Sequence, residues 1–122
     1  MTESLFDTNI LIDALKGVSQ AAAELGRVER RWISRVTWIE IMAGADPDSA
    51  KEIEAFLDHF SVTEIDEDVA RRAAALRNRN KNMKLPDAII WASAQAGGHI
   101  LVTRNTRDFP ANALGVRVPY KL

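Results

Sequence analysis

The stretch LPDAIIWASAQAGGHILVT, residues 85–103, decides the fold class of this chain. Pro86 is typical of a first helical turn, and residues 88–96 are nearly all apolar, which predicts a helix buried on most sides. The glycine pair at 97–98 ends that helix, and the run 99–103 predicts a strand directly after it. A buried helix that leads into a strand is typical of α/β folds.

The alternation of helix and strand continues outward from this stretch. Strands separated by helices need crossover connections, so we expect a mainly parallel sheet covered by helices on both faces. The chain shows no internal repeat and no linker, which indicates a single domain over residues 1–122. Further strands are expected at 4–6, 31–34, 62–65 and 116–118, and helices at 8–16, 21–28, 36–44, 47–60 (with Pro47 in its first turn) and 66–76.

The composition excludes several classes of protein. The 122 residues include no cysteine, which excludes zinc fingers, iron–sulfur sites and thiol nucleophiles. With 47% hydrophobic and 27% charged residues, the chain is expected to fold as a globular protein in solution. No apolar run approaches the roughly 20 residues of a membrane-spanning helix, and the N-terminus does not resemble a signal peptide. We therefore expect a cytoplasmic protein with no membrane partner.

The charge is unevenly distributed along the chain. Residues 1–70 carry 15 acidic and 6 basic side chains, a net charge of −9, whereas residues 71–122 carry 2 and 10, a net charge of +8, and the two sum to −1. The run 71–84 holds six basic residues and no acid. Such a run is either a solvated face or a surface that binds phosphates.

Four acids occupy positions that can converge. Asp7 follows the first strand, Glu40 lies on a helix, Asp87 lies in a first helical turn, and Asp108 lies in a loop after a buried strand. In parallel α/β sheets, ligands gather at the carboxyl ends of the strands. Carboxylates about 4 Å apart repel by roughly 4 kcal/mol, so such a cluster must protonate or bind a cation. Oxygen ligands without cysteine suit Mg²⁺ or Mn²⁺.

Each acid also has an ordinary structural interpretation. Asp7 could cap a helix, and Glu40 could form a capping box with Thr37. Asp87 could stabilise the helix dipole, and Asp108 could organise a turn. Among the remaining chemistry-bearing residues, His59 and His99 are not expected to bind a metal, and Trp32, Trp38 and Trp91 are expected in the core.

Four motifs resemble those of PIN-domain ribonucleases, in particular VapC-type toxins of toxin–antitoxin pairs. They are FDTN at 6–9, TWIEIMAG at 37–44, LPDAIIWASA at 85–94 and TRNTRDF at 103–109, and they occur in the order found in the family. The resemblance spans residues 5 to about 118. It implies a three-layer α/β/α sandwich and a Mg²⁺-dependent endoribonuclease, with Mn²⁺ as a substitute ion. It also implies a homodimer and inhibition by a cognate antitoxin.

The resemblance assigns roles to particular residues. Asp7, Glu40 and Asp87 match three catalytic, metal-binding acids of the family, and Asp108 is expected to be the fourth. Asn105 is a possible ligand because many members have an acid at its position, and Thr103 could add a hydroxyl contact. Five basic residues are expected to bind RNA. Three of them end the run 71–84 and two lie in the loop that carries Asp108: Arg79, Lys81, Lys84, Arg104 and Arg107.

Three other functions remain open from the sequence. A PIN nuclease of RNA processing would keep the same fold and site. A phosphoacceptor receiver domain fits the length and fold class, but it needs paired acids and a late lysine that HILVTRN, residues 99–105, does not offer. A catalytically silent binding module is disfavoured by the presence of Asp7, Glu40 and Asp87.

Overall fold

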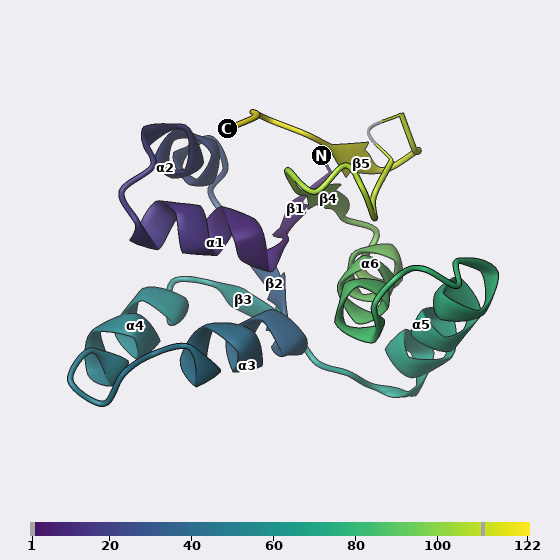
Figure 1. Ribbon diagram of the computed structural model, residues 1–122, viewed down its shortest axis with the longest axis horizontal. Coiled ribbons are helices and arrows are strands. Elements are labelled where there is room, and N and C mark those ends of the chain that lie inside the picture. The colour runs from purple at the N-terminus through teal and green to yellow at the C-terminus, as the bar shows by residue number, and fades with distance from the viewer. Residues whose placement is uncertain (1, 111) are drawn as a thin grey trace.

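The computed structural model describes residues 2–110 and 112–122 and contains a five-stranded sheet in the order β3-β2-β1-β4-β5 (Figure 1). Every pair of neighbouring strands is parallel, which confirms the expected sheet. The elements are β1 (Ser4–Phe6), α1 (Thr8–Leu15), α2 (Ser19–Gly26), β2 (Arg31–Ser34), α3 (Arg35–Ala43), α4 (Ala50–Leu57), β3 (Ser61–Thr63), α5 (Glu67–Arg79), α6 (Leu85–Gly97), β4 (Ile100–Val102) and β5 (Val116–Arg117).

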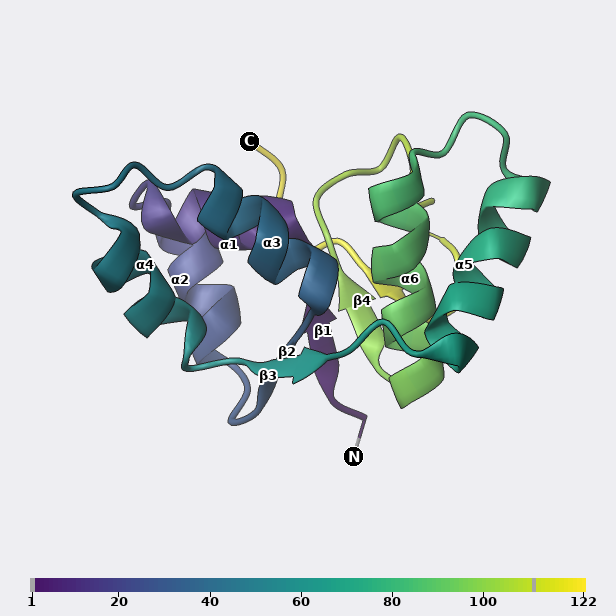
Figure 2. The same ribbon diagram turned by 90° about the horizontal axis from the view of Figure 1, so that it is seen from below.

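The sheet separates two hydrophobic cores. Successive strand residues point to opposite faces, so Leu5 and Leu101 pack on one side while Phe6 and Val102 pack on the other. The first pair meets the apolar side chains of α5 and α6, and the second pair meets those of α1 to α4. Figures 1 and 2 show these two groups of helices on either side of the strands. The α/β class and the three-layer α/β/α arrangement are therefore confirmed.

Local capping explains where three helices begin and end. The side chain of Asp7 accepts a hydrogen bond from Thr8 N at the start of α1, and the side chain of Asp66 accepts one from Val69 N at the start of α5. Gly98 ends α6 in the left-handed conformation, with φ of 67°, which glycine adopts without steric cost.

One expected helix start and one ordinary interpretation are wrong. Helix α4 begins at Ala50 because Pro47 lies in a preceding turn, in which Asp46 Oδ1 accepts the backbone N–H groups of Asp48 and Ser49 at 3.0 Å each. Helix α3 begins at Arg35 with Ser34 as its N-cap, so Thr37 and Glu40 do not form a capping box.

The topology places two distant segments at one edge of the sheet. Strands β1 and β4 are neighbours, and Asp7 N donates a hydrogen bond to Val102 O at 2.9 Å. The loop after β4 therefore leaves the sheet beside Asp7, as the expected parallel pairing requires. Of the helices in the described residues, none has the length and apolar character needed to cross a membrane.

Candidate active site

Asp7 is the buried centre of the candidate site, with 3% of its surface exposed. Its Oδ1 accepts Thr8 N at 2.7 Å, and its Oδ2 accepts the Thr103 hydroxyl at 2.8 Å and Asn9 Nδ2 at 3.2 Å. Burial raises the pKa of Asp7 to about 6, and the charge of Glu40 adds to the rise, although the hydrogen bonds from Thr103 and Thr8 oppose it. Asp7 is thus both a helix cap and a destabilised carboxylate.

Glu40 is linked to Asp7 through Thr8. Thr8 donates its hydroxyl hydrogen to Glu40 Oε1 at 2.7 Å, and its oxygen lies 2.9 Å from the Thr37 hydroxyl. Thr37 is fully buried on α3, so this contact ties α3 to the start of α1. No role was expected for Thr8 from the sequence, although this residue lies inside the FDTN motif at 6–9.

Asp87 carries the clearest sign that the acids converge. It lies in the first turn of α6, as expected. Burial raises its pKa to about 7, helped by the nearby charge of Asp7, by hydrogen bonding and charge from Asp108, and by the charge of Glu40. The fold therefore brings all four acids expected from the sequence close enough to interact.

Asn105 builds the loop that presents Asp108. Its Oδ1 accepts the backbone N–H groups of Arg107 and Asp108 at 3.2 and 3.3 Å, and its Nδ2 donates to Asp108 Oδ2 at 3.0 Å. The Asn105 backbone N–H donates to the Thr103 hydroxyl oxygen at 2.9 Å. Asn105 therefore organises the turn, whereas the ordinary interpretation gave this role to Asp108. Asn105 also orients the carboxylate of Asp108.

The four acids line one pocket of about 280 Å³. In the part of the chain that the structure describes, no three acidic or histidine side chains are arranged tightly enough to hold a metal ion as they stand. Three of these carboxylates would therefore have to come closer together to share one ion. The pocket is lined by Asp7, Thr8, Asn9, Ile12, Glu40, Lys84, Pro86, Asp87, Asn105 and Asp108.

The expected RNA-binding cations divide into three groups. Lys84 lines the pocket of the acids, whereas Arg79, Lys81 and Arg107 line an adjoining pocket that shares Asp108. Arg104 differs from them, because its guanidinium is paired with a carboxylate inside the protein. At the start of the basic run, Arg71 and Arg72 pair with acids one turn earlier on α5 and belong to a solvated face.

The partner of Arg104 is Asp13, which is 2% exposed on α1. Arg104 donates to both oxygens of Asp13, with 3.0 Å between Nη2 and Oδ1, and the Tyr120 hydroxyl donates to Asp13 Oδ2 at 2.7 Å. This cluster joins α1, the loop after β4 and the C-terminal segment. Nothing in the sequence distinguished Asp13 from a solvated helix residue, because its partners lie 91 and 107 positions away.

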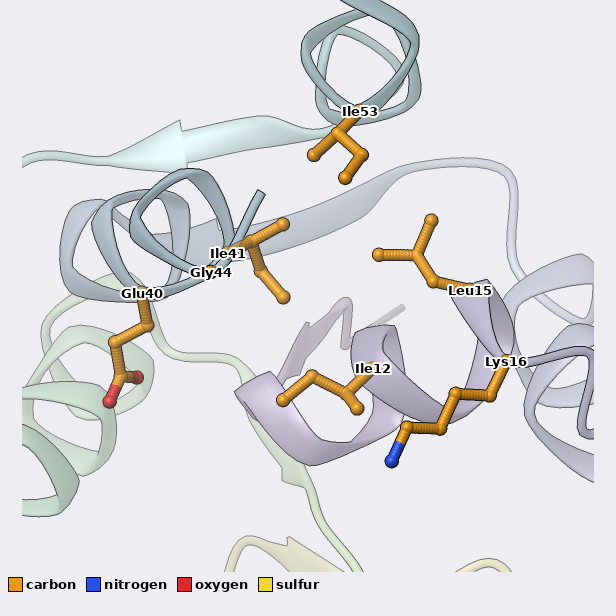
Figure 3. Close-up of a pocket in the computed structure, with 7 residues that line it drawn as sticks. All are labelled: Ile12, Leu15, Lys16, Glu40, Ile41, Gly44 and Ile53. Atoms are coloured by element: carbon orange, nitrogen blue, oxygen red, sulfur yellow. The ribbon is translucent and has the colours of Figure 1, made fainter. Parts of the chain in front are cut away.

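An apolar pocket of about 290 Å³ lies beside the acids and shares Ile12 and Glu40 with them. Figure 3 shows Ile12 and Leu15 of α1 facing Ile41 of α3 and Ile53 of α4, with the carboxylate of Glu40 pointing away from them. Ile12 and Leu15 are 38% and 43% exposed, so this surface is available to a partner.

Comparisons with known proteins find similar chains. A family model described as PIN domain matches residues 4–113. The chain is 29% identical over 120 residues to the tRNA(fMet)-specific endonuclease VapC of Shigella flexneri, covering 89% of this chain and 91% of that protein. It is 31% identical over 114 residues to ribonuclease VapC19 of Mycobacterium tuberculosis, covering 87% and 91%. A solved toxin–antitoxin complex from Klebsiella pneumoniae contains a similar chain, with a TM-score of 0.91, 43% identity, and coverage of 98% of this chain and 100% of that one.

Proposed function

Because this chain belongs to the PIN-domain family, with VapC ribonucleases among its relatives, we propose that it is a metal-dependent endoribonuclease, the toxin of a toxin–antitoxin pair. The observation that carries the proposal is the pocket in which Asp7, Glu40, Asp87 and Asp108 meet. Family membership also contradicts the receiver-domain alternative.

The donor set fits a hard divalent cation. The pocket offers carboxylate oxygens, hydroxyls and amides and no sulfur, which suits Mg²⁺, with Mn²⁺ as a substitute. The raised pKa values of Asp7 and Asp87 support the same conclusion, because a bound cation would offset both the burial and the neighbouring negative charges that raise them. Asp7, Glu40, Asp87 and Asp108 would hold the ion, and the ion would supply activation of water and neutralisation of the phosphodiester.

The residues of the chain perform the remaining tasks. Thr103 and Thr8 orient the Asp7 and Glu40 carboxylates, and Asn105 orients Asp108. Lys84 places a positive charge in the same pocket, where it can bind the scissile phosphate. The residues that line this pocket include no histidine, so the RNA 2′-hydroxyl is not expected to serve as nucleophile. The products should carry a 5′-phosphate and a 3′-hydroxyl.

The partners follow from the same assignment. The similar chain from Klebsiella pneumoniae was solved in a toxin–antitoxin complex, and we propose that this chain also binds an antitoxin. The apolar pocket beside Glu40 supports this proposal, because a partner that covers Ile12 and Leu15 also lies next to the acids. We further propose a homodimer that acts on RNA in the cytoplasm, and sedimentation would test its oligomeric state.

The decisive experiment measures RNA cleavage by the purified chain with Mg²⁺, with Mn²⁺ and with excess chelator. Cleavage that requires the ion and leaves 5′-phosphate ends is the expected result. Undiminished cleavage in chelator, or a 2′,3′-cyclic phosphate at the cut, would contradict the mechanism. The variant Asp48→Asn, in an exposed turn away from the pocket, provides a matched control for substitutions of the four acids.

A further inference from the structure

A second polar pocket, of about 340 Å³, adjoins the pocket of the acids and shares Asp108 with it. Its walls come from the end of α5, the segment that connects α5 to α6, the helix α6 itself, and the loop after β4. The lining residues are Arg79, Asn80, Lys81, Asn82, Met83, Trp91, Arg107, Asp108 and Pro110.

The lining combines three kinds of group that a nucleotide needs. Arg79, Lys81 and Arg107 supply three positive charges against the single negative charge of Asp108. Asn82 supplies an amide, whose donor and acceptor can pair with the edge of a base. Trp91, which was expected in the core, is only partly buried and lines this pocket. Its ring packs edge-on against that of Phe109, with 5.6 Å between the ring centroids.

The two asparagines of the pocket differ in how free they are. Asn80 ends α5, and its Nδ2 donates to Leu76 O at 2.8 Å, so its amide maintains the backbone. Asn82 is exposed, and among the described residues its side chain makes no hydrogen bond. Its amide is therefore available to a ligand.

We propose that this pocket is a nucleotide subsite, in which Asn82 reads the base of a nucleotide beside the scissile phosphate while Lys81 and Arg107 bind the backbone. The proposal rests on the endoribonuclease function above and adds a source of sequence preference to it. RNA specificity arises from unpaired bases whose edges are hydrogen-bonded, whereas phosphate contacts position the strand without reading it. Sharing Asp108 puts this subsite directly next to the site of hydrolysis.

The lining favours RNA over an acidic peptide as the occupant. A peptide carboxylate would need only the cations, whereas the aromatic ring and the free amide match the face and the edge of a base. The position also favours RNA, because a strand whose phosphate lies among the four acids must continue into a neighbouring surface.

The test separates base reading from phosphate binding. A pool of single-stranded oligoribonucleotides with a randomised centre is digested with Mg²⁺, and the product ends are sequenced. For Asn82→Ala, the ratio between the most and least preferred base at one position beside the cut should fall by about tenfold, the effect of a lost hydrogen bond. For Lys81→Ala that ratio should stay as in the unmodified chain, while binding weakens and the log–log salt slope drops by about one unit.

Matched controls keep each outcome interpretable. Gln95→Ala removes an exposed amide near the C-terminal end of α6, whereas Asn82 precedes the N-terminal end, and it should leave the base profile unchanged. An unchanged profile in Asn82→Ala, an equal loss of preference at all positions, or the lack of any preference beside the cut in the unmodified chain would overturn the subsite. An unchanged base profile in Asn82→Ala, together with weaker binding of poly-glutamate by Lys81→Ala, would assign the pocket to an acidic peptide instead. No cleavage by the unmodified chain with either ion would contradict the endoribonuclease function itself.

Discussion

Thr103 donates its hydroxyl hydrogen to Oδ2 of Asp7 at 2.8 Å, across 96 positions of sequence. The same hydroxyl oxygen accepts the backbone N–H of Asn105, so a single side chain joins the buried acid at the end of β1 to the loop that presents Asp108. The positions of two of the proposed metal ligands are thus coupled through one threonine.

This coupling predicts that Thr103→Val impairs cleavage, although the Thr103 side chain is fully buried. Valine has a similar shape but cannot donate to Asp7, and the hydrogen bond from Thr103 lowers the pKa of that carboxyl. Its loss should move the acid limb of the pH–rate profile to higher pH and reduce the rate at pH 7. Thr103→Ser retains the hydroxyl and should restore the profile; a valine variant with the original pH profile would contradict the role.

Replacing Asp7 should separate activity from stability. Asp7→Asn removes a buried carboxylate whose pKa is raised to about 6, while asparagine remains a good helix cap. Cleavage should be lost, and the metal-free protein should become about 1–2 kcal/mol more stable at pH 7.5. Urea unfolding measures the second effect with Asp48→Asn as the reference, and a variant that is less stable than the unmodified chain would show that the carboxylate is not under strain.

The acids also predict how the stability of the metal-free protein depends on pH. Asp7 and Asp87 have folded-state pKa values of about 6 and about 7, both above the unfolded value near 3.8. Between about pH 4 and pH 7 the folded chain therefore binds more protons, and these two groups lower the free energy of unfolding as the pH rises. Asp7→Asn should flatten this slope, and added Mg²⁺ should raise the thermal midpoint more at pH 8 than at pH 5.

Asp13 and Glu24 affect the free energy of unfolding in a lower pH range than Asp7 and Asp87 do. Hydrogen bonds from Arg104 and Tyr120 hold the pKa of Asp13 below its usual value, and Arg117 and Arg27 do the same for Glu24. Their contribution is present above pH 4 and is lost as the pH falls through the depressed values. Asp13→Asn should cost about 1–3 kcal/mol at pH 7, because the Arg104 guanidinium loses its charged partner. Arg71→Ala, at an exposed pair, should be nearly neutral in the same unfolding measurement.

Asp108 and Asn105 should respond differently to substitution. Asp108→Asn removes a charge from the pocket and should raise the Mg²⁺ concentration needed for half-maximal cleavage. Asn105→Ala removes the acceptor that holds the 105–108 turn, so it should lower the rate with a smaller change in Mg²⁺ dependence. A Mg²⁺ titration of both variants distinguishes the roles, and the opposite order would make Asn105 the fourth ligand.

The sequence by itself determined the elements, the parallel sheet and the four acids. These follow from local rules: the apolar run at 88–96, the glycines after it, and the positions of Asp7 after a strand and Asp87 in a first helical turn each depend on nearby residues. Once the strands are parallel, their carboxyl ends must meet at one edge, which is why Asp7 and Asp108 could be placed together without coordinates.

Only the tertiary structure decided the hydrogen-bond partners of these acids and the use of the arginines. Arg104 and Arg107 are three residues apart and chemically identical, yet one pairs with the buried Asp13 while the other lines the second pocket. Likewise Thr37 supports Thr8 instead of capping its own helix. The physical reason is that a side-chain contact depends on which distant residue the packed backbone brings within about 3 Å, and no local pattern encodes that distance.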